Sequence, residues 1–223
     1  MTIRLAGTGY NFLLVLFPVL FYCYCGINTA GGFETTNGVR IVVCADSIKG
    51  IAVPGSQVIV CDTSYVAPSL TRESFVDTVY ADQNGHFKFN FLKNGRYNLI
   101  ARSRELNRGA LITKIDIDKE NPVQYSDSAE YLKLGSISGT VISDSIIEYN
   151  CIVYSKGLAI SVISDSLGNY RLPDVPPGMY RLQAYQIISR GIETLIYNAT
   201  RDSVLVEEAS NETGVDLKLE LWK

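Results

Sequence analysis

Apolar and polar residues alternate in short runs along most of the chain, and turn residues separate these runs. The clearest run covers residues 86–91, where Phe87, Phe89 and Phe91 alternate with polar residues. Because successive side chains of a strand point to opposite faces, this spacing predicts a strand with one buried face. No stretch after residue 38 carries a helical pattern long enough to compete. The pattern therefore predicts an all-β fold.

About seven strands are predicted in each half of the chain. In the first half they are expected at residues 39–45, 57–62, 75–81, 86–91, 96–102, 111–117 and 130–134. In the second half they are expected at residues 136–142, 151–154, 158–163, 169–172, 179–187, 203–207 and 215–221. Residues 39–45 and 136–142 are then the first strands of their halves. Most of the excess length of the first half falls at residues 64–72, which should form a protruding loop.

A set of residues recurs at a fixed distance of 83 positions, without a gap. The matched pairs are Asp82 and Asp165, Gly85 and Gly168, Phe87 and Tyr170, Gly95 and Gly178, Tyr97 and Tyr180, Leu99 and Leu182, and Ala101 and Ala184. Such self-similarity indicates that one module occurs twice. We expect residues 82–101 to superpose on residues 165–184 within two separate β-sandwiches.

The matched residues have structural roles. Asp82 and Asp165 open tight turns in which the aspartate accepts backbone hydrogen bonds, and the glycine that closes each turn tolerates unusual dihedral angles. Gly95 and Gly178 fit turns that need a residue without Cβ, and the tyrosine two positions later should be a core ring.

Residues 1–25 differ from the rest of the chain. Arg4 precedes an uncharged, mostly apolar run at residues 11–24, whose length suits the core of a signal peptide and is short for a membrane span. Pro18 in its middle also disfavours a long regular helix. A buried core helix is the alternative, but the position before an all-β chain favours export. Residues 26–37 then form a linker.

Two cysteines lie where the apolar run ends. Cys23 and Cys25, the latter followed by glycine, resemble the lipidated cysteine of a bacterial lipoprotein, and Cys25 is the better candidate. Tyr22 and Tyr24 stand where that pattern wants small residues, so cleavage at residues 28–30 without lipidation is the alternative. We therefore expect a membrane partner, through either a lipid or the leader itself.

The second half resembles the carboxypeptidase regulatory-like domain. The family pattern is Asp-x-x-Gly-x-aromatic followed by Pro-Pro-Gly-x-Tyr-x-Leu. It is carried here by Asp165, Gly168, Tyr170, Pro176, Pro177, Gly178, Tyr180 and Leu182. The first half keeps Asp82, Gly85, Phe87, Gly95, Tyr97 and Leu99 but has Lys93 and Asn94 in place of the prolines.

The resemblance implies a fold and a domain organisation. It implies two tandem seven-stranded antiparallel β-sandwiches of the transthyretin (prealbumin-like) type. We assign residues 1–25 to the leader, 26–37 to the linker, 38–134 to the first copy and 135–223 to the second copy. Modules of this family are usually non-catalytic, serving as spacers, docking surfaces or, in related folds, sugar-binding units.

Composition and charge reduce the number of functions that fit the chain. The formal net charge is −3, from 20 basic and 23 acidic residues, and no basic stripe is present, so nucleic-acid binding is not expected. His86 is the only histidine and lies on the polar face of its strand, where a solvated side chain is expected rather than a catalytic base. Acidic groups at Asp116, Asp118 and Glu120, or at Asp127 and Glu130, lack the spacing of an EF-hand loop. We expect no catalytic residues, no metal and no cofactor.

The remaining cysteines are expected to be free. Cys44 and Cys61 each end a strand, and in consecutive antiparallel strands they would lie at opposite ends, about 17 Å apart. A disulfide needs Cα atoms within about 7 Å. Cys44, Cys61 and Cys151 are therefore predicted to be largely buried thiols.

Aromatic side chains offer the best opening for a ligand. Tyr65 in the long loop, with Tyr149, Tyr154 and Tyr197 in the second copy, could stack on sugar rings. The sequence as a whole predicts an exported, non-catalytic protein of the bacterial cell envelope, anchored at the outer membrane or displayed on the cell surface. It would act as a structural or protein-interaction module with an envelope protein or glycan partner. The alternative is a carbohydrate-binding surface protein that uses these loop aromatics.

Overall fold

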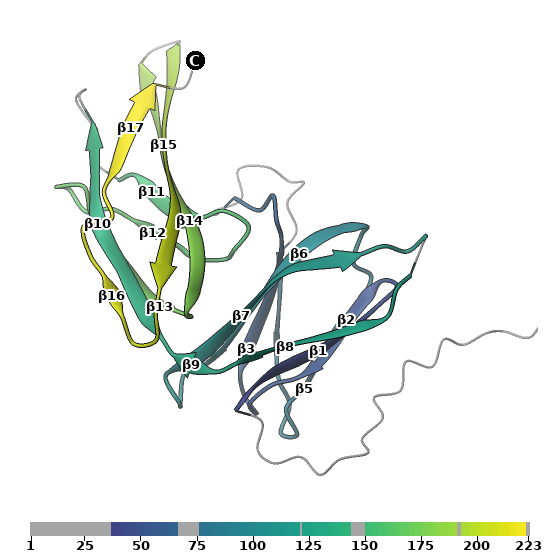
Figure 1. Ribbon diagram of the computed structural model, residues 1–223. Coiled ribbons are helices and arrows are strands. Elements are labelled where there is room, and N and C mark those ends of the chain that lie inside the picture. Colours follow the sequence, from purple (N-terminus) through teal and green to yellow (C-terminus); the bar gives the residue numbers. More distant parts are fainter. Residues whose placement is uncertain (1–36, 67–75, 121, 144–149, 191–192, 222–223) are drawn as a thin grey trace, which may run out of the picture. The chain divides into compact units, whose positions relative to one another are not determined.

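The computed structural model describes residues 37–66, 76–120, 122–143, 150–190 and 193–221 (Figure 1). Residues 33–223 group into one compact unit. All the secondary-structure elements of the described residues are β-strands, which confirms the predicted all-β fold. The leader, with Cys23 and Cys25, lies outside the described residues, as does the linker up to residue 36. Asn37 is already attached to the first copy, because its carbonyl oxygen accepts the backbone N–H of Tyr131 at 2.8 Å.

The first copy consists of two sheets. Its strands are β1 (Gly38–Cys44), β2 (Ser47–Ile51), β3 (Gln57–Asp62), β4 (Val76–Tyr80), β5 (His86–Phe89), β6 (Gly95–Ser103), β7 (Arg108–Ile117), β8 (Tyr125–Glu130) and β9 (Leu132–Lys133). One sheet has the order β5-β2-β1-β8 and the other the order β4-β3-β6-β7-β9. All described pairings within these two sheets are antiparallel.

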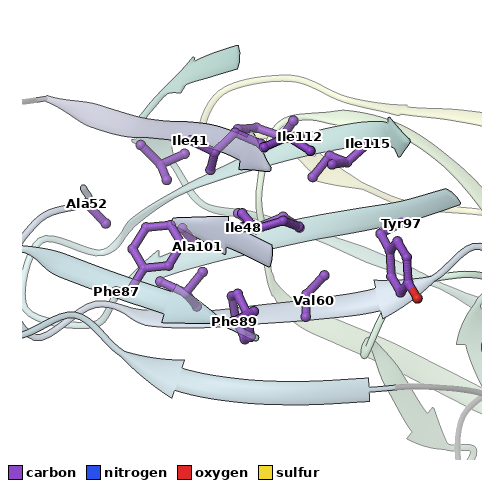
Figure 2. Close-up of a cluster of buried hydrophobic side chains, with 14 of the residues drawn as sticks. Ile41, Ile48, Ala52, Val60, Phe87, Phe89, Tyr97, Ala101, Ile112 and Ile115 are labelled. Atoms are coloured by element: carbon purple, nitrogen blue, oxygen red, sulfur yellow. The ribbon is translucent and has the colours of Figure 1, made fainter. Parts of the chain in front are cut away.

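The core of the first copy lies between its two sheets. Ile41, Ile48 and Phe89 come from one sheet, while Val60 and Tyr97 come from the other, and all belong to one buried cluster (Figure 2). Two sheets that share one apolar core between their inner faces form a β-sandwich.

The strands of the second copy form one connected path. They are β10 (Gly135–Ser143), β11 (Ile152–Ser155), β12 (Ser161–Ile163), β13 (Asn169–Val175), β14 (Gly178–Arg190), β15 (Glu193–Val206), β16 (Asn211–Glu212) and β17 (Leu217–Leu221). The order is β12-β11-β14-β15-β17-β10-β13, with β16 also paired to β10. Strand β17 connects the two parts of this path. It pairs with β10 through Leu217–Leu219 and with β15 through Glu220 and Leu221. The second buried cluster lies within this path.

The strand details differ from the sequence prediction. The first copy has nine strands and the second eight, rather than seven each, and β10 pairs with β16 and β17 in parallel rather than antiparallel fashion. The missed strands are β2 (SIKGI), β8 (YSDSAE) and β16 (NE). Strand β2 is short and contains a glycine, β8 and β16 are polar, and the missed part of β15 is also largely polar, so none alternates clearly. These strands are held by pairing with a neighbour, which hydropathy does not reveal.

The matching of strands between the two copies also differs from the prediction. Gly50 of β2 lies opposite Phe87, and Gly139 of β10 lies opposite the matching aromatic, Tyr170. Strand β2 is therefore the counterpart of β10, with the sequence SIKG at residues 47–50 matching SISG at residues 136–139. The prediction that residues 39–45 are the counterpart of residues 136–142 is wrong, and β1 is an additional strand of the first copy.

The turns that define the repeat are the same in both copies. The carboxylate of Asp82 accepts the backbone N–H groups of Asn84 and His86, and that of Asp165 accepts those of Leu167 and Asn169, all within 2.8–2.9 Å. The closing glycines have φ of 82° at position 85 and 84° at position 168. A Cβ at Gly85 would lie 2.2 Å from the carbonyl oxygen of Ala52, so this turn requires glycine.

In both copies, the tyrosine of the repeat is held by a hydrogen bond from its hydroxyl to a backbone carbonyl four residues earlier. The hydroxyl of Tyr97 donates to the carbonyl oxygen of Lys93 at 2.9 Å, and that of Tyr180 donates to the carbonyl oxygen of Pro176 at 2.5 Å. Both rings are buried, as predicted, and both strands carry a register shift directly after the tyrosine. Each tyrosine therefore fills its core while tying down the loop four residues before it.

The alternation of buried and exposed side chains predicted for residues 86–91 stops after Phe89. Phe87 and Phe89 are buried, whereas Phe91 is 84% exposed and has a φ of 59°. Because the backbone turns there, Phe91 does not share the face of the other two rings. The prediction of three phenylalanines on one buried face is wrong for Phe91.

Replacing Tyr180 should destabilise the protein strongly. We expect Tyr180→Ala to lower the free energy of unfolding by about 3–5 kcal/mol, since a buried ring is lost. Tyr180→Phe should cost about 1–3 kcal/mol, because the buried carbonyl of Pro176 loses its donor. Denaturant titration measures both. Met179→Ala, at the exposed neighbouring position, is the control, and a loss for Tyr180→Ala no larger than for this control would contradict the assigned role.

Candidate functional site

The only histidine of the chain belongs to a structural turn. His86 is exposed, and its Nδ1 lies 3.7 Å from Oδ1 of Asp82. The hydrogen bond from the His86 backbone, followed by that from Asn84, lowers the pKa of the Asp82 carboxyl. The equivalent aspartate, Asp165, has a lowered pKa because of hydrogen bonds from the Asn169 side chain and from backbone groups of the turn. No histidine accompanies it, so the shared chemistry of the two turns is hydrogen bonding.

The acidic groups are engaged by neighbouring residues. Oδ1 of Asp116 lies 2.7 Å from Nε of Arg96, and Oδ1 of Asp118 accepts the backbone N–H of Glu120 at 2.9 Å. Within the described ranges, no group of three or more His, Cys, Asp or Glu side chains could hold a metal ion. The same ranges contain no apolar helix of membrane-spanning length.

The cysteines differ in part from expectation. Cys61 and Cys151 are free and buried, as predicted. Burial raises the pKa of Cys61 to about 12 and also raises that of Cys151, so both thiols are poor nucleophiles. Cys44 is disulfide-bonded, so the prediction of a free thiol there is wrong. The prediction weighed only Cys61 as its partner, and Cys61 is free.

The aromatics that were expected to stack on sugars are placed differently. Tyr65 and Tyr154 are 8% and 7% exposed, so the expectation that they present open rings is wrong. Tyr197 is half-buried against the second core, and Tyr149 lies outside the described residues. Along a strand, alternation separates two faces but does not reveal that both faces are covered.

The buried tyrosines form a third apolar cluster, which joins the two copies. It contains Ile59, Cys61 and Tyr65 of the first copy together with Tyr154 and Tyr185 of the second. The rings of Tyr154 and Tyr185 meet edge to face, with centroids 5.8 Å apart and an interplanar angle of 72°. Ile100 of β6 is buried in the core cluster of the second copy. The outer face of β3 and β6 is therefore an internal contact surface.

Polar groups complete this contact at Gly157. Its carbonyl oxygen accepts the Nδ2 group of Asn98 at 3.0 Å, and its N–H donates to the carbonyl oxygen of Tyr65 at 2.8 Å. Oδ1 of Asn98 also accepts the backbone N–H of Lys114 at 3.1 Å. The Asn98 amide thus has a fixed orientation, and it bonds both copies at once.

A pocket of about 190 Å³ lies on the same outer face, at the other end of β3 and β6. Tyr80, Gln57 and Arg102 line it as cross-strand neighbours, because Gln57 pairs with Tyr80 on β4 and with Arg102 on β6. Arg104 and Glu105, in the turn after β6, line it too. The structure thus brings a phenol, an amide and two guanidinium groups together at one site. The sequence analysis missed this site, because the three strand positions become neighbours only through the strand register.

Arg102 is the unusual member of this group. Its Nε is buried and has no hydrogen-bond partner in the part of the chain that the structure describes. Burial lowers the pKa of the guanidinium, opposed by the nearby Tyr180 and Asp174 of the second copy. Among the described residues Arg102 has no salt bridge, unlike Arg96 and Arg181, whose Nε atoms lie within 2.7–2.8 Å of aspartates.

Comparisons with known proteins give only distant similarities. No protein-family model and no curated protein matches the chain, so the resemblance to carboxypeptidase regulatory-like domains stays a prediction. A type II cohesin–X-dockerin complex from Acetivibrio cellulolyticus is similar at 16% identity over 39% of this chain, with a TM-score of 0.31. The match covers 58% of that structure's chain.

Two pilins are similar over more of their length. The minor pilin GBS52 of Streptococcus agalactiae is 16% identical over 78% of this chain and 87% of its own, with a TM-score of 0.30. The shaft pilin SpaA of Lactobacillus rhamnosus GG is 9% identical over 77% of this chain and 86% of its own, with a TM-score of 0.26. None of these similarities assigns an activity to the chain.

The two turn aspartates should make stability depend on acid pH. Their pKa values are lowered from 3.8 in the folded state, so their contribution is present above that value and is lost as the pH falls through the folded pKa values. We expect the denaturation midpoint of Asp82→Asn/Asp165→Asn to fall less between pH 5 and pH 3 than that of wild type. Glu207→Gln/Glu220→Gln, the same charge change at exposed positions, is the control. Equal acid sensitivity of wild type and the aspartate variant would count against this role.

Proposed function

We propose that the protein is a non-catalytic structural or protein-interaction component of the bacterial cell envelope, built from modules at residues 38–134 and 135–223. The observation that carries this proposal is the buried contact between the copies. Tyr154 and Tyr185 of the second copy pack on Ile59 and Cys61 of the first, and Asn98 bonds across to Gly157. A contact of this kind holds two modules in one orientation, which suits a spacer or a platform for a partner.

The proposed location depends on the N-terminal segment. We propose export through residues 1–25 and anchoring at the membrane, with Cys25 or Cys23 carrying the lipid. A sulfur atom in a disulfide cannot also carry a lipid thioether. The lipidated cysteine and any cysteine bonded to Cys44 must therefore be different residues.

The spacer proposal predicts coupled unfolding. Wild type should give one calorimetric transition, because the contact between the copies must break before either unfolds. The variant Ile59→Ala/Tyr185→Ala removes apolar groups from the contact and should separate the transition into two. Met179→Ala, an exposed change on the strand that carries Tyr185, should leave one transition. Two transitions in wild type, or one in the double variant at an unchanged midpoint, would refute rigid coupling.

The anchor proposal predicts a membrane-bound protein that one cysteine change releases. In cell fractionation, wild type should partition into detergent, because two acyl chains hold a protein at a membrane far more firmly than one. Cys25→Ser or Cys23→Ser should release it, and Cys151→Ser should not. If the double variant Cys23→Ser/Cys25→Ser stays in the membrane fraction, the leader itself is the anchor. Fully soluble wild type with an N-terminus near Gly31 would refute the anchor.

A further inference from the structure

The row of Tyr80, Gln57 and Arg102 is built as a binding surface. Neighbouring strands lie about 4.8 Å apart, so the backbones of Tyr80 and Arg102 are about 10 Å apart with Gln57 between them. On the next strand the row ends at Gly109, where a Cβ would lie 3.2 Å from Cγ of Pro176. Going beyond the structural role, we propose that this row binds an acidic saccharide, with a sugar ring on Tyr80 and the carboxylate of a hexuronate at Arg102.

The guanidinium supplies the charge selection. Arg102 keeps its charge at any physiological pH, and its buried Nε lacks an acceptor among the described residues. The buried Nε is out of reach of a ligand, so a carboxylate in the pocket would pair with the terminal N–H groups of this guanidinium through short charge-assisted hydrogen bonds. Asp174 and Tyr180 lie near enough to influence the guanidinium, but neither bonds it. Arg104 adds a second positive charge at the rim of the pocket.

The phenol supplies a flat, open contact. Tyr80 is 67% exposed, and its hydroxyl accepts a hydrogen bond from Nε2 of Gln57 at 3.4 Å. The face of an aromatic ring is negative, so the C–H groups on one face of a sugar ring pack well against it. The pocket, at about 190 Å³, has room for a single sugar ring, so the second ring of a disaccharide would lie outside it.

The position of the row favours a saccharide over an acidic peptide. An extended peptide would bind by adding a strand to an exposed sheet edge, which here is β4. Arg102 lies on β6, two strands inside that edge, and it is reached across the face of the sheet. A ring compound lying flat on the face can reach both Tyr80 and Arg102, whereas a peptide paired with β4 would run along the strands.

Replacing Glu105 should change the binding affinity in the opposite direction to replacing Tyr80 or either arginine. The Glu105 carboxylate shares the pocket with Arg102 and Arg104, and it would repel a bound hexuronate. Glu105→Gln should therefore strengthen binding, whereas a change to Tyr80 or either arginine should weaken it. A general loss of folding cannot produce this pattern.

The experiment is calorimetric titration of the full chain in detergent with digalacturonate, its dimethyl ester and the peptide Glu-Glu-Glu. We expect binding of digalacturonate that weakens with added salt, with at least tenfold weaker binding of the ester. Tyr80→Ala and Arg104→Gln, both at exposed positions, should each weaken binding about tenfold. Arg102→Gln should abolish it, and Glu105→Gln should strengthen it severalfold. Phe91→Ala and Arg171→Gln, at exposed positions elsewhere, are the controls.

Each other outcome overturns the proposal. Equal binding of acid and ester would remove the role of Arg102, and equal binding by Tyr80→Ala and wild type would remove the role of the ring. Tighter binding of the peptide than of digalacturonate would identify an acidic protein segment as the ligand instead. Absence of binding by a wild type that still unfolds cooperatively would refute the site, while leaving the structural role untouched.

Discussion

Burial of both faces of β6 is the constraint on which the rest of the structure depends. Tyr97, Leu99 and Ala101 face the core of the first copy, while Ile100 on the opposite face is buried in the core cluster of the second. A strand covered on both sides cannot serve as an open surface. It instead joins the two copies, and the pocket lies at the end of its sheet that carries Arg102 and Tyr80.

The repeat made much of the fold predictable. The aspartate–glycine turns, the buried tyrosines and the glycines before them occur where the 83-residue offset places them. These features depend on local backbone geometry and on burial of single rings, and both leave a direct trace in the sequence. Phe91 shows the limit of this reasoning, because an alternating pattern continues through a residue at which the backbone has already turned.

The candidate site could not be predicted in the same way. Tyr80, Gln57 and Arg102 are far apart in sequence, and only the register of β4, β3 and β6 brings them together. Tyr65 and Tyr154 are buried rather than open for a related reason. A tyrosine on the outer face of a strand is open or covered depending on what packs on that face, and the sequence does not contain that packing explicitly. Cys44 likewise is disulfide-bonded, which the spacing between neighbouring strands did not suggest.

Tandem copies of one module can exchange equivalent strands while they fold. The two copies here differ in the strand that lies beside β2 and beside β10. The position beside β2 is taken by β1, an antiparallel strand that precedes it in the chain, whereas the position beside β10 is taken by β16 and β17, parallel strands that follow it. At this position, a strand of one copy therefore has the wrong direction to replace the corresponding strand of the other. The asymmetry should keep newly made chains from becoming entangled dimers, even though the two sequences share their turns and their core tyrosines.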